Sequence, residues 1–290
     1  MTTTDNIPAF GSGKGHRDEN FPVASYVIRP DLRPVVLAFY RVARKADDIA
    51  DHESASETEK LEQLEKIEKS LLGTAATDMD SVALRETLND RHITTQHALD
   101  LLEAFRRDVT KKRYADWTDL MEYCRYSAAP VGRFMLDVHG ESPSTWPASD
   151  ALCAALQVIN HLQDCAKDYR TLDRVYLPMD ILDEEGAAIP SLAGNAATPE
   201  LQRVIARLAG KSLELMERSK GLADEVNDTR LATEVAVIHR LGLDLNRKLL
   251  EKDPLSKRVH HLPAEAGLLM LTTIVKFLAA RPFRRQGGEK

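Results

Sequence analysis

Apolar residues recur every three or four positions along most of the chain, which is the spacing of one face of an α-helix. Residues 53–72 carry charges on the other faces and one apolar stripe, which consists of Leu61, Leu64, Ile67 and Leu71. The same spacing, with suitable end residues, predicts helices over 20–29, 34–52, 79–92, 95–114, 117–139, 147–169, 179–185, 199–225, 228–251 and 263–280. Turn-bounded strands and internal repeats are missing. We predict one all-α domain over residues 19–282, between a flexible segment at 1–18 and a flexible basic tail at 283–290.

The helix predicted over 117–139 is interrupted at Pro130, which removes a backbone N–H donor, so we expect a kink there. Small residues surround this position: Ser127, Ala128, Ala129 and Gly132. They leave room either for a ligand or for a closely packed helix, and packing alone is a sufficient explanation.

Two groups of acidic residues recur at helical spacing. Asp47 and Asp51 lie four residues apart, so both carboxylates project from one helix face, with Arg44 one turn earlier. Alone, such a pair is equally typical of an exposed helix face. Because the residues before both groups are mostly apolar, we expect the carboxylates to be paired or to coordinate a metal. The second group, also at four-residue spacing, consists of Asn160, Asp164 and Asp168.

On facing helices, the two groups would offer hard oxygen ligands suited to Mg²⁺, which shares its coordination with water and substrate phosphate. Several other enzyme classes do not fit, because the chain has no Glu-x-x-His pair, no His-Asp dipeptide, no Gly-rich phosphate loop and no Gly-x-Ser-x-Gly elbow. Basic residues accompany both acidic groups, and the surrounding helices are apolar. The combination favours an apolar substrate that carries a diphosphate.

Composition and the ends of the sequence indicate which partners and which cellular location to expect. Hydrophobic residues make up 43% of the chain and charged residues 29%, and the net charge of −6 argues against nucleic acid as a partner. The N-terminus lacks the apolar core of a signal peptide, so we expect a cytoplasmic protein. The last predicted helix is apolar and is followed by a basic tail with Arg281, Arg284 and Arg285. This tail could place the protein peripherally at the inner membrane face, although core packing explains the helix as well.

Three segments in this order resemble the head-to-head isoprenoid synthases, that is, the squalene and phytoene synthase family. Together they cover most of the chain between about residues 20 and 180. The resemblance implies an all-α, single-domain helical bundle of the class I isoprenoid synthase type with a central cavity. The segments are Phe39–Asp51, Tyr123–Gly132, and the series Gln157, Asn160, Asp164 and Asp168 followed by Arg174 and Tyr176.

The same resemblance implies a role for each of these residues. Arg44 and Arg174 would neutralise the departing diphosphate, and aromatic faces would stabilise a carbocation in a dry cavity. For each aromatic residue, ordinary core packing is an equally good explanation. The implied Mg²⁺ ligands are Asp47, Asp48, Asp51, Asn160, Asp164 and Asp168, of which Asp47, Asp51, Asp164 and Asp168 are catalytic. The implied substrate contacts are Arg44, Tyr40, Tyr123, Tyr126, Phe134, Gln157, Arg174 and Tyr176.

Within the family, Glu19–Ser25 is similar to the branch that converts presqualene diphosphate into hydroxysqualene in bacterial squalene and hopanoid biosynthesis. The spacer from Asp168 to Tyr176 is also one residue longer than the phytoene synthase pattern. The expected activity is therefore that of an Mg²⁺-dependent carbon–oxygen lyase, which ionises the diphosphate, rearranges the cyclopropane and adds water. Two alternatives stay open: a prenyltransferase that makes presqualene diphosphate or phytoene, and a non-catalytic helical partner of such a synthase. The implied partners are the isoprenoid diphosphate, a membrane surface and neighbouring pathway enzymes, without nucleic acid.

Overall fold

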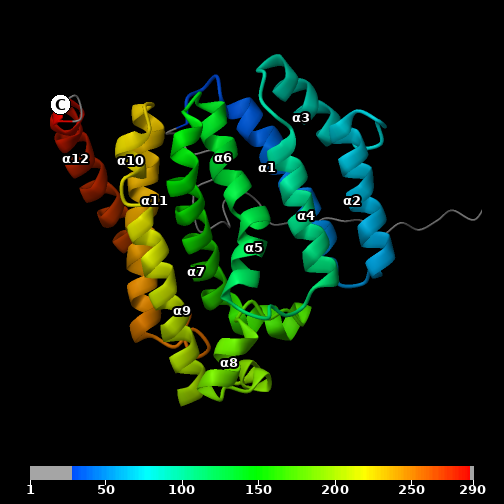
Figure 1. Cartoon of the computed structure of the whole chain (residues 1–290), viewed down its shortest axis with the longest axis vertical. Helices are drawn as coiled ribbons and strands as arrows, with labels where there is room; N and C mark the ends of the chain where they lie inside the picture. The colour runs from blue at the N-terminus through cyan, green and yellow to red at the C-terminus, as the bar shows by residue number, and fades with distance from the viewer. Residues whose placement is uncertain (1–27, 288–290) are drawn as a thin grey trace, which may run out of the picture.

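The computed structural model describes residues 28–287, and Figure 1 shows how they are arranged. Within this range the chain forms α-helices and two short 3₁₀ helices and has no β-strand, so the predicted all-α class is confirmed. The α-helices are α1 (Arg33–Ala50), α2 (Glu57–Leu72), α3 (Met79–Asp90), α4 (Gln96–Thr110), α5 (Trp117–Ser127), α6 (Ala129–Val138), α7 (Trp146–Leu172), α8 (Met179–Glu185), α9 (Pro199–Arg218), α10 (Leu222–Glu225), α11 (Thr229–Glu251) and α12 (Pro263–Gly287); the 3₁₀ helices are η1 (Pro143–Thr145) and η2 (Ile189–Ala193).

Among the described residues, buried hydrophobic side chains form two clusters. One cluster joins α1, α2, α3 and α4 and includes Phe134 and Val138 of α6. The other is centred on α7, which packs against α6, α9 and α11, and includes Leu136 of α6. Figure 1 shows α7 between α1–α4 and α9–α12. Helix α6 therefore joins the two halves of the bundle.

Residue chemistry at the helix ends explains several boundaries. Ser56 accepts a hydrogen bond from the Glu59 N–H, and Glu59 accepts one from the Ser56 N–H, which is the capping box that starts α2. Gly73 ends this helix with φ of +76°, a left-handed conformation that glycine adopts without strain. Pro130 lies in the first turn of α6, where an N–H would have no helical partner. The break predicted at Pro130 is thus confirmed between α5 and α6.

Helix α4 stops at Thr110 rather than near Tyr114. The backbone is extended at Lys111, with φ of −116° and ψ of 120°. The following residue pairs with the segment after α7, because the Val175 N–H donates to the Lys112 carbonyl (2.9 Å). This pairing places the end of α4 beside the end of α7.

Other helix ends also differ from the predicted ones. Helix α7 continues to Leu172 and α12 continues to Gly287, whereas α9 ends at Arg218 and α10 forms separately. The expectations for residues 1–27, among them the flexible segment and the helix over 20–29, lie outside the described residues, as does the end of the tail at 288–290.

The small residues near the break leave room for a neighbouring helix. Gly132 of α6 lies so close to α7 that an added Cβ atom would overlap Ser149 Oγ and lie 2.6 Å from Cys153 Sγ. Both are short side chains fixed on a helix, so neither can move far aside. Of the two explanations for the small residues, close helix packing is the one that the structure shows at Gly132.

We expect Gly132→Ala to lower the melting temperature, because overpacking the contact between α6 and α7 costs about 1–3 kcal/mol, at roughly 2–4 °C per kcal/mol. Gly210→Ala in α9 is the matched control, since nothing lies within 4 Å of its added Cβ. The better helix propensity of alanine should make this control slightly more stable. Thermal unfolding followed by circular dichroism measures both variants. A Gly132→Ala protein as stable as the wild type would contradict the tight packing.

Candidate active site

The first acidic group lies at the C-terminal end of α1, whose opposite face is buried in the cluster that joins α1–α4. Arg44 donates two hydrogen bonds, from Nη1 to Asp47 Oδ2 (2.9 Å) and from Nη2 to Asp48 Oδ1 (2.6 Å). Asp51 follows the last residue of the helix. The structure therefore places Arg44 beside Asp47, as the sequence spacing predicted, and beside Asp48.

The second acidic group lies near the end of α7, and the residue after this helix redirects the chain. Asp173 has φ of +51°, which is uncommon for a residue other than glycine. The next residue, Arg174, is only 4% exposed and reaches the end of α1. It donates from Nη1 to Asp51 Oδ1 (2.5 Å), from Nη2 to the Ala50 carbonyl (3.1 Å) and from Nε to the Asp108 carbonyl (2.9 Å). Arg174 therefore ties the end of α7 to α1 and α4.

The two acidic groups influence each other electrostatically. Burial raises the pKa of Asp47 to about 7, and the charge of Asp51 adds to the increase, whereas Arg44 opposes it. Burial also raises the pKa of Asp168 to about 7, with further contributions from Asp164 and from Asp51 of the other group. Both carboxyl groups thus lie in a buried environment to which neighbouring carboxylates add negative potential. This environment favours a cation between the two groups.

The residues present fit a magnesium ion. Within residues 28–287, no three His, Cys, Asp or Glu side chains converge as a preformed metal cage would. Mg²⁺ does not need such a cage, because it keeps several waters and commonly binds through one or two carboxylates and substrate phosphates. The donors are of the hard oxygen type that this ion prefers: the carboxylates of Asp47, Asp48, Asp51, Asp164 and Asp168 and the amide oxygen of Asn160.

Asp108 of α4 is a buried acid that the sequence motifs did not reveal. Its carboxylate accepts hydrogen bonds from the hydroxyl groups of Tyr123 (2.9 Å) and Tyr176 (2.7 Å). Burial raises its pKa to about 6, and Arg174 and the two hydroxyl groups limit the increase. In the sequence Asp108 stands among basic residues and resembles one more surface charge. The available signal was its position four residues after Ala104, on the buried stripe of α4.

Tyr123 and Tyr176 pack in an aromatic cluster with two further rings, Tyr114 and His161. The His161 ring stacks on Tyr176, with centroids 3.7 Å apart and an interplanar angle of 12°. Burial, together with the charge of Arg174, lowers the pKa of His161 to about 3, so its imidazole is neutral at physiological pH. The structure thus brings two of the predicted aromatic residues together beside Arg174.

The other predicted substrate residues lie in different surroundings. Phe134 stacks on Phe39, with ring centroids 3.8 Å apart. Tyr126 lies under the guanidinium of Arg107, 4.3 Å from the ring centroid. The structure therefore does not bring all the predicted aromatic residues into one group. The remaining two are half-buried: Tyr40 on α1 and Gln157 on α7.

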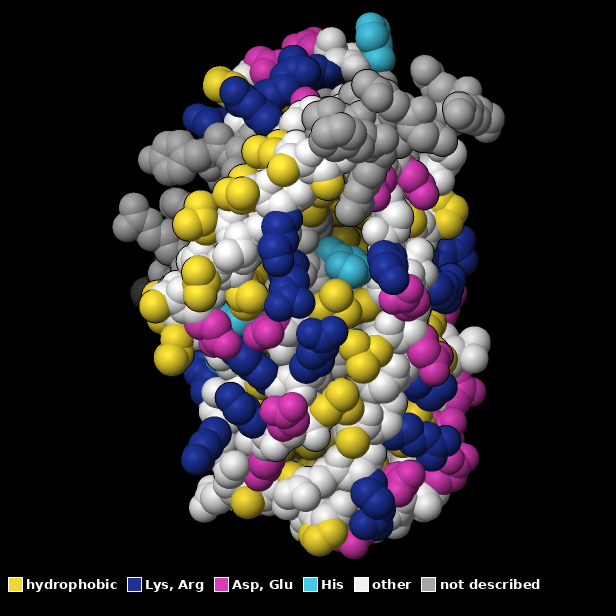
Figure 2. All heavy atoms as spheres, turned by 90° about the vertical axis from the view of Figure 1, so that its left-hand side faces the viewer, with side chains coloured by type: hydrophobic (Ala, Val, Ile, Leu, Met, Phe, Trp, Pro, Cys, Tyr) yellow, Lys and Arg dark blue, Asp and Glu magenta, His cyan; other side chains and the backbone are white. Residues whose placement is uncertain are grey.

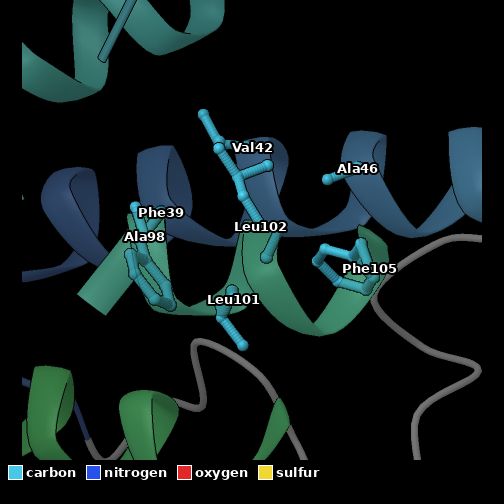
Figure 3. A pocket seen from close by; sticks show the side chains of 8 residues that line it. Phe39, Val42, Ala46, Ala98, Leu101, Leu102 and Phe105 are labelled. Atoms are coloured by element: carbon cyan, nitrogen blue, oxygen red, sulfur yellow. The ribbon is translucent and has the colours of Figure 1, made fainter. Parts of the chain in front are cut away.

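Two hollows lie near the acidic groups. The polar pocket, which is bounded in part by Asp51 and Arg174, has a volume of about 300 Å³. A second recess between α1 and α4 is lined by apolar side chains and has no room for a water molecule. Figure 3 shows Phe39 and Val42 of α1 beside Leu102 of α4 in this recess. The recess belongs to the packing between the two helices, whereas the polar pocket can hold a ligand.

An all-α bundle with acidic groups at the ends of α1 and α7 is the architecture of an isoprenoid synthase. A sequence profile of the squalene/phytoene synthase family matches residues 15–265, and the chain belongs to this family. The structure of squalene synthase HpnC from Alicyclobacillus acidocaldarius matches with a TM-score of 0.69 and 32% sequence identity, covering 78% of this chain and 85% of that chain. The family predicted from the motifs is confirmed.

Relatives within the family differ in their similarity to this chain. The hydroxysqualene synthase of Rhodopseudomonas palustris is 55% identical over 94% of this chain and 93% of its own length. The phytoene synthase of Thermus thermophilus is 27% identical over 92% of this chain and 91% of its own length. The chain is therefore much more similar to the former enzyme than to the latter.

The raised pKa of Asp168 predicts a pH-dependent stability of the metal-free protein. The pKa of this carboxyl rises from its ordinary value of 3.8 to about 7 in the folded protein, so the folded state loses stability as the pH rises between these values. Asp168→Asn removes the charge, and its melting temperature relative to the wild type should increase from about pH 5 to about pH 8. Because water screens a half-buried group, we expect a gain of about 1 kcal/mol, or roughly 2–4 °C.

Asp183→Asn, at an exposed position of α8, is the matched control and should show the same offset from the wild type at every pH. Differential scanning fluorimetry with a chelator present measures both variants. Added Mg²⁺ should instead favour the wild type, which retains the ligand. If the offset of Asp168→Asn does not change across this pH range, the electrostatic coupling described above is wrong.

Proposed function

We propose that this protein converts presqualene diphosphate and water into hydroxysqualene and inorganic diphosphate, in an Mg²⁺-dependent lyase reaction of squalene and hopanoid biosynthesis. The observation that carries the proposal is the similarity to a hydroxysqualene synthase over nearly the full length of both chains. The acidic groups of α1 and α7 support it, because the reaction begins with the departure of a metal-bound diphosphate.

In the first step the C–O bond of the diphosphate ester breaks, and its electron pair leaves with the diphosphate. Mg²⁺, when bound, acts as a Lewis acid toward this leaving group. We assign Arg44, which is paired with Asp47 and Asp48, to neutralise part of the added negative charge. We assign the ion to the oxygen donors of Asp47, Asp48, Asp51, Asn160, Asp164 and Asp168.

We assign Arg174 to the same step. Its three hydrogen bonds, to Asp51, Ala50 and Asp108, use three of the five N–H donors of a guanidinium. The other two donors remain to bind phosphate oxygens. Because this side chain is already fixed, binding the diphosphate orders no further rotatable bonds of the arginine.

The carbocation that remains must rearrange before water reaches it. Opening of the cyclopropane moves the positive charge along the carbon chain, and addition of water with loss of a proton then gives the alcohol. Aromatic faces stabilise a cation without acting as bases, and the neutral His161 beside Tyr176 adds no competing positive charge. The residues that we assign to the path of the apolar chain are Tyr40, Tyr123, Tyr126, Phe134, Gln157 and Tyr176.

The two alternatives have less support. A synthase that condenses two allylic diphosphates would use the same ionisation, but the identity to a phytoene synthase is 27%, against 55% to a hydroxysqualene synthase. A non-catalytic partner would not need its acidic residues, and this chain retains both groups complete.

Purified protein incubated with Mg²⁺ and presqualene diphosphate should release inorganic diphosphate and form an alcohol. In water labelled with heavy oxygen the product should carry the label, which mass spectrometry detects, because the hydroxyl oxygen comes from solvent. Farnesyl diphosphate alone should give no product. Turnover of farnesyl diphosphate without turnover of presqualene diphosphate would assign the protein to the condensing alternative.

Variants of the acidic groups serve as controls in the same assay. Asp47→Ala and Asp164→Ala should each lower kcat by about 100-fold or more, while the circular dichroism spectrum stays helical. Asp183→Ala on α8 should keep wild-type activity, because Asp183 is exposed and belongs to neither group. Full activity in both of the former variants would exclude the proposed metal ligands.

The C-terminal helix supports a proposal about location, namely that α12 contacts the inner membrane face. Its segment Pro263–Arg281 is long and apolar enough to cross a membrane by length and composition, yet only 6% of it is buried. Arg281 ties α12 to the rest of the bundle by donating a hydrogen bond to the Val226 carbonyl (2.7 Å). Figure 2, which views this side of the molecule, shows hydrophobic side chains in a row with Lys and Arg beside them. The exposed apolar residues on α12 are Leu268, Leu271, Val275 and Leu278.

A peripheral helix of this kind should bind anionic lipid through apolar insertion and basic residues. Replacing both Leu268 and Leu271 with Ser should weaken co-sedimentation with vesicles of phosphatidylcholine and phosphatidylglycerol by about tenfold or more. Leu72→Ser is the matched control, because Leu72 is 54% exposed but lies on α2, in the other half of the bundle. The location proposal fails if the wild type does not bind these vesicles or if the double variant binds as well as the control.

A further inference from the structure

The polar pocket beside the acidic groups has a basic lining. Its residues come from the loop after α1, from α2, from the connection between α4 and α5, and from the end of α7, and its volume is about 300 Å³. Asp51 and Arg174 belong both to this pocket and to the candidate active site, so the pocket adjoins the acidic groups. The charged residues that line the pocket are Asp51, Glu53, Lys60, Lys112, Arg170, Asp173 and Arg174.

Most of the acids in this lining are already neutralised. Asp51 is paired with Arg174 (2.5 Å), and Asp173 is paired with Arg113 (2.6 Å), which is not part of the lining. Glu53 is exposed. Three cations, from Lys60, Lys112 and Arg170, therefore remain against one carboxylate.

None of these three cations has a carboxylate partner within the described residues. Lys60 Nζ donates to the Ala50 carbonyl (3.1 Å), and Arg170 donates to two carbonyls in the loop before α9. The ammonium of Lys112 makes no hydrogen bond or ion pair with any residue of the range 28–287, although its side chain is half-buried. The Nζ atom of Lys112 is not among the buried side-chain atoms that lack a partner, so an anion from solvent can reach it.

The positive charges also repel one another. Burial lowers the pKa of both Lys60 and Lys112, and the nearby charge of Arg174 lowers it further. Like charges gathered around a hollow create a local potential that attracts polyanions. The pocket is open to solvent and is lined in part by Asp51 and Arg174, so an anion in it lies beside the candidate active site.

We propose that Lys60, Lys112 and Arg170 form a binding site for inorganic diphosphate, which receives the leaving group after the C–O bond has broken. The preference for a polyanion follows from the pocket alone, whereas the source of that anion rests on the proposed function. Moving the leaving group into this pocket separates it from the carbocation. It thereby prevents the diphosphate from recombining with the cation before water adds.

Isothermal titration of sodium diphosphate into the full-length protein, in buffer with a chelator, tests the site without the metal. The wild type should bind one diphosphate, and Lys60→Gln and Lys112→Gln should each weaken the affinity about tenfold. Lys66→Gln is the matched control, because Lys66 is an exposed lysine of the same helix as Lys60 but does not line the pocket. In turnover assays, Lys112→Gln should also raise the inhibition constant of added diphosphate about tenfold.

Each outcome bears on the proposal. Absence of metal-free binding, or equal affinity of the Lys112→Gln and Lys66→Gln proteins, would overturn it. Equal affinity of the wild type for sulfate and diphosphate would show a general counter-ion site and would also overturn it. Lysine-dependent diphosphate binding in a protein that does not turn over presqualene diphosphate would leave this site in place and refute the proposed reaction.

Discussion

The candidate active site depends on the burial of one arginine. Arg174 is 4% exposed, and an unpaired guanidinium at such a position would cost several kcal/mol in lost hydration. The fold supplies partners from two other helices, the Asp51 carboxylate and Ala50 carbonyl at the end of α1 and the Asp108 carbonyl of α4. The ends of α1, α4 and α7 must therefore meet for the arginine to be stable. The same meeting of helix ends brings the two acidic groups together.

The site also lies at the junction of the two hydrophobic clusters. Helix α1, which carries the first acidic group, packs in the cluster that joins α1–α4. Helix α7, which carries the second group, packs in the other cluster. The two groups of carboxylates therefore approach each other where the two clusters meet, and their mutual repulsion acts at this boundary. The pKa of Asp168 reflects this arrangement, because burial raises it and the charges of Asp164 and of Asp51 from the other group raise it further. A polyvalent cation is the species that relieves this repulsion.

The sequence was sufficient for features that depend on local spacing. The period of apolar residues predicted the helices, Pro130 predicted the break between α5 and α6, and four-residue spacing predicted the acidic faces. Features that depend on distant contacts were not predictable in this way. Helix α4 ends at Thr110 because its next residues pair with Val175, which no local pattern records. Asp108 likewise resembles a surface charge until the tyrosines from α5 and from the segment after α7 are placed against it.

The left-handed turn at Asp173 links the direction of Arg174 to a distant part of the chain. A positive φ at a residue other than glycine costs about 1 kcal/mol, and here Arg113 holds the turn by donating to both the Asp173 carboxylate (2.6 Å) and the Asp173 carbonyl. Arg113, from the connection between α4 and α5, thus fixes the backbone conformation at Asp173 and with it the direction in which Arg174 leaves α7. Variation at Arg113 would consequently alter the position of Arg174 beside Asp51, although this side chain lies outside both the acidic groups and the polar pocket.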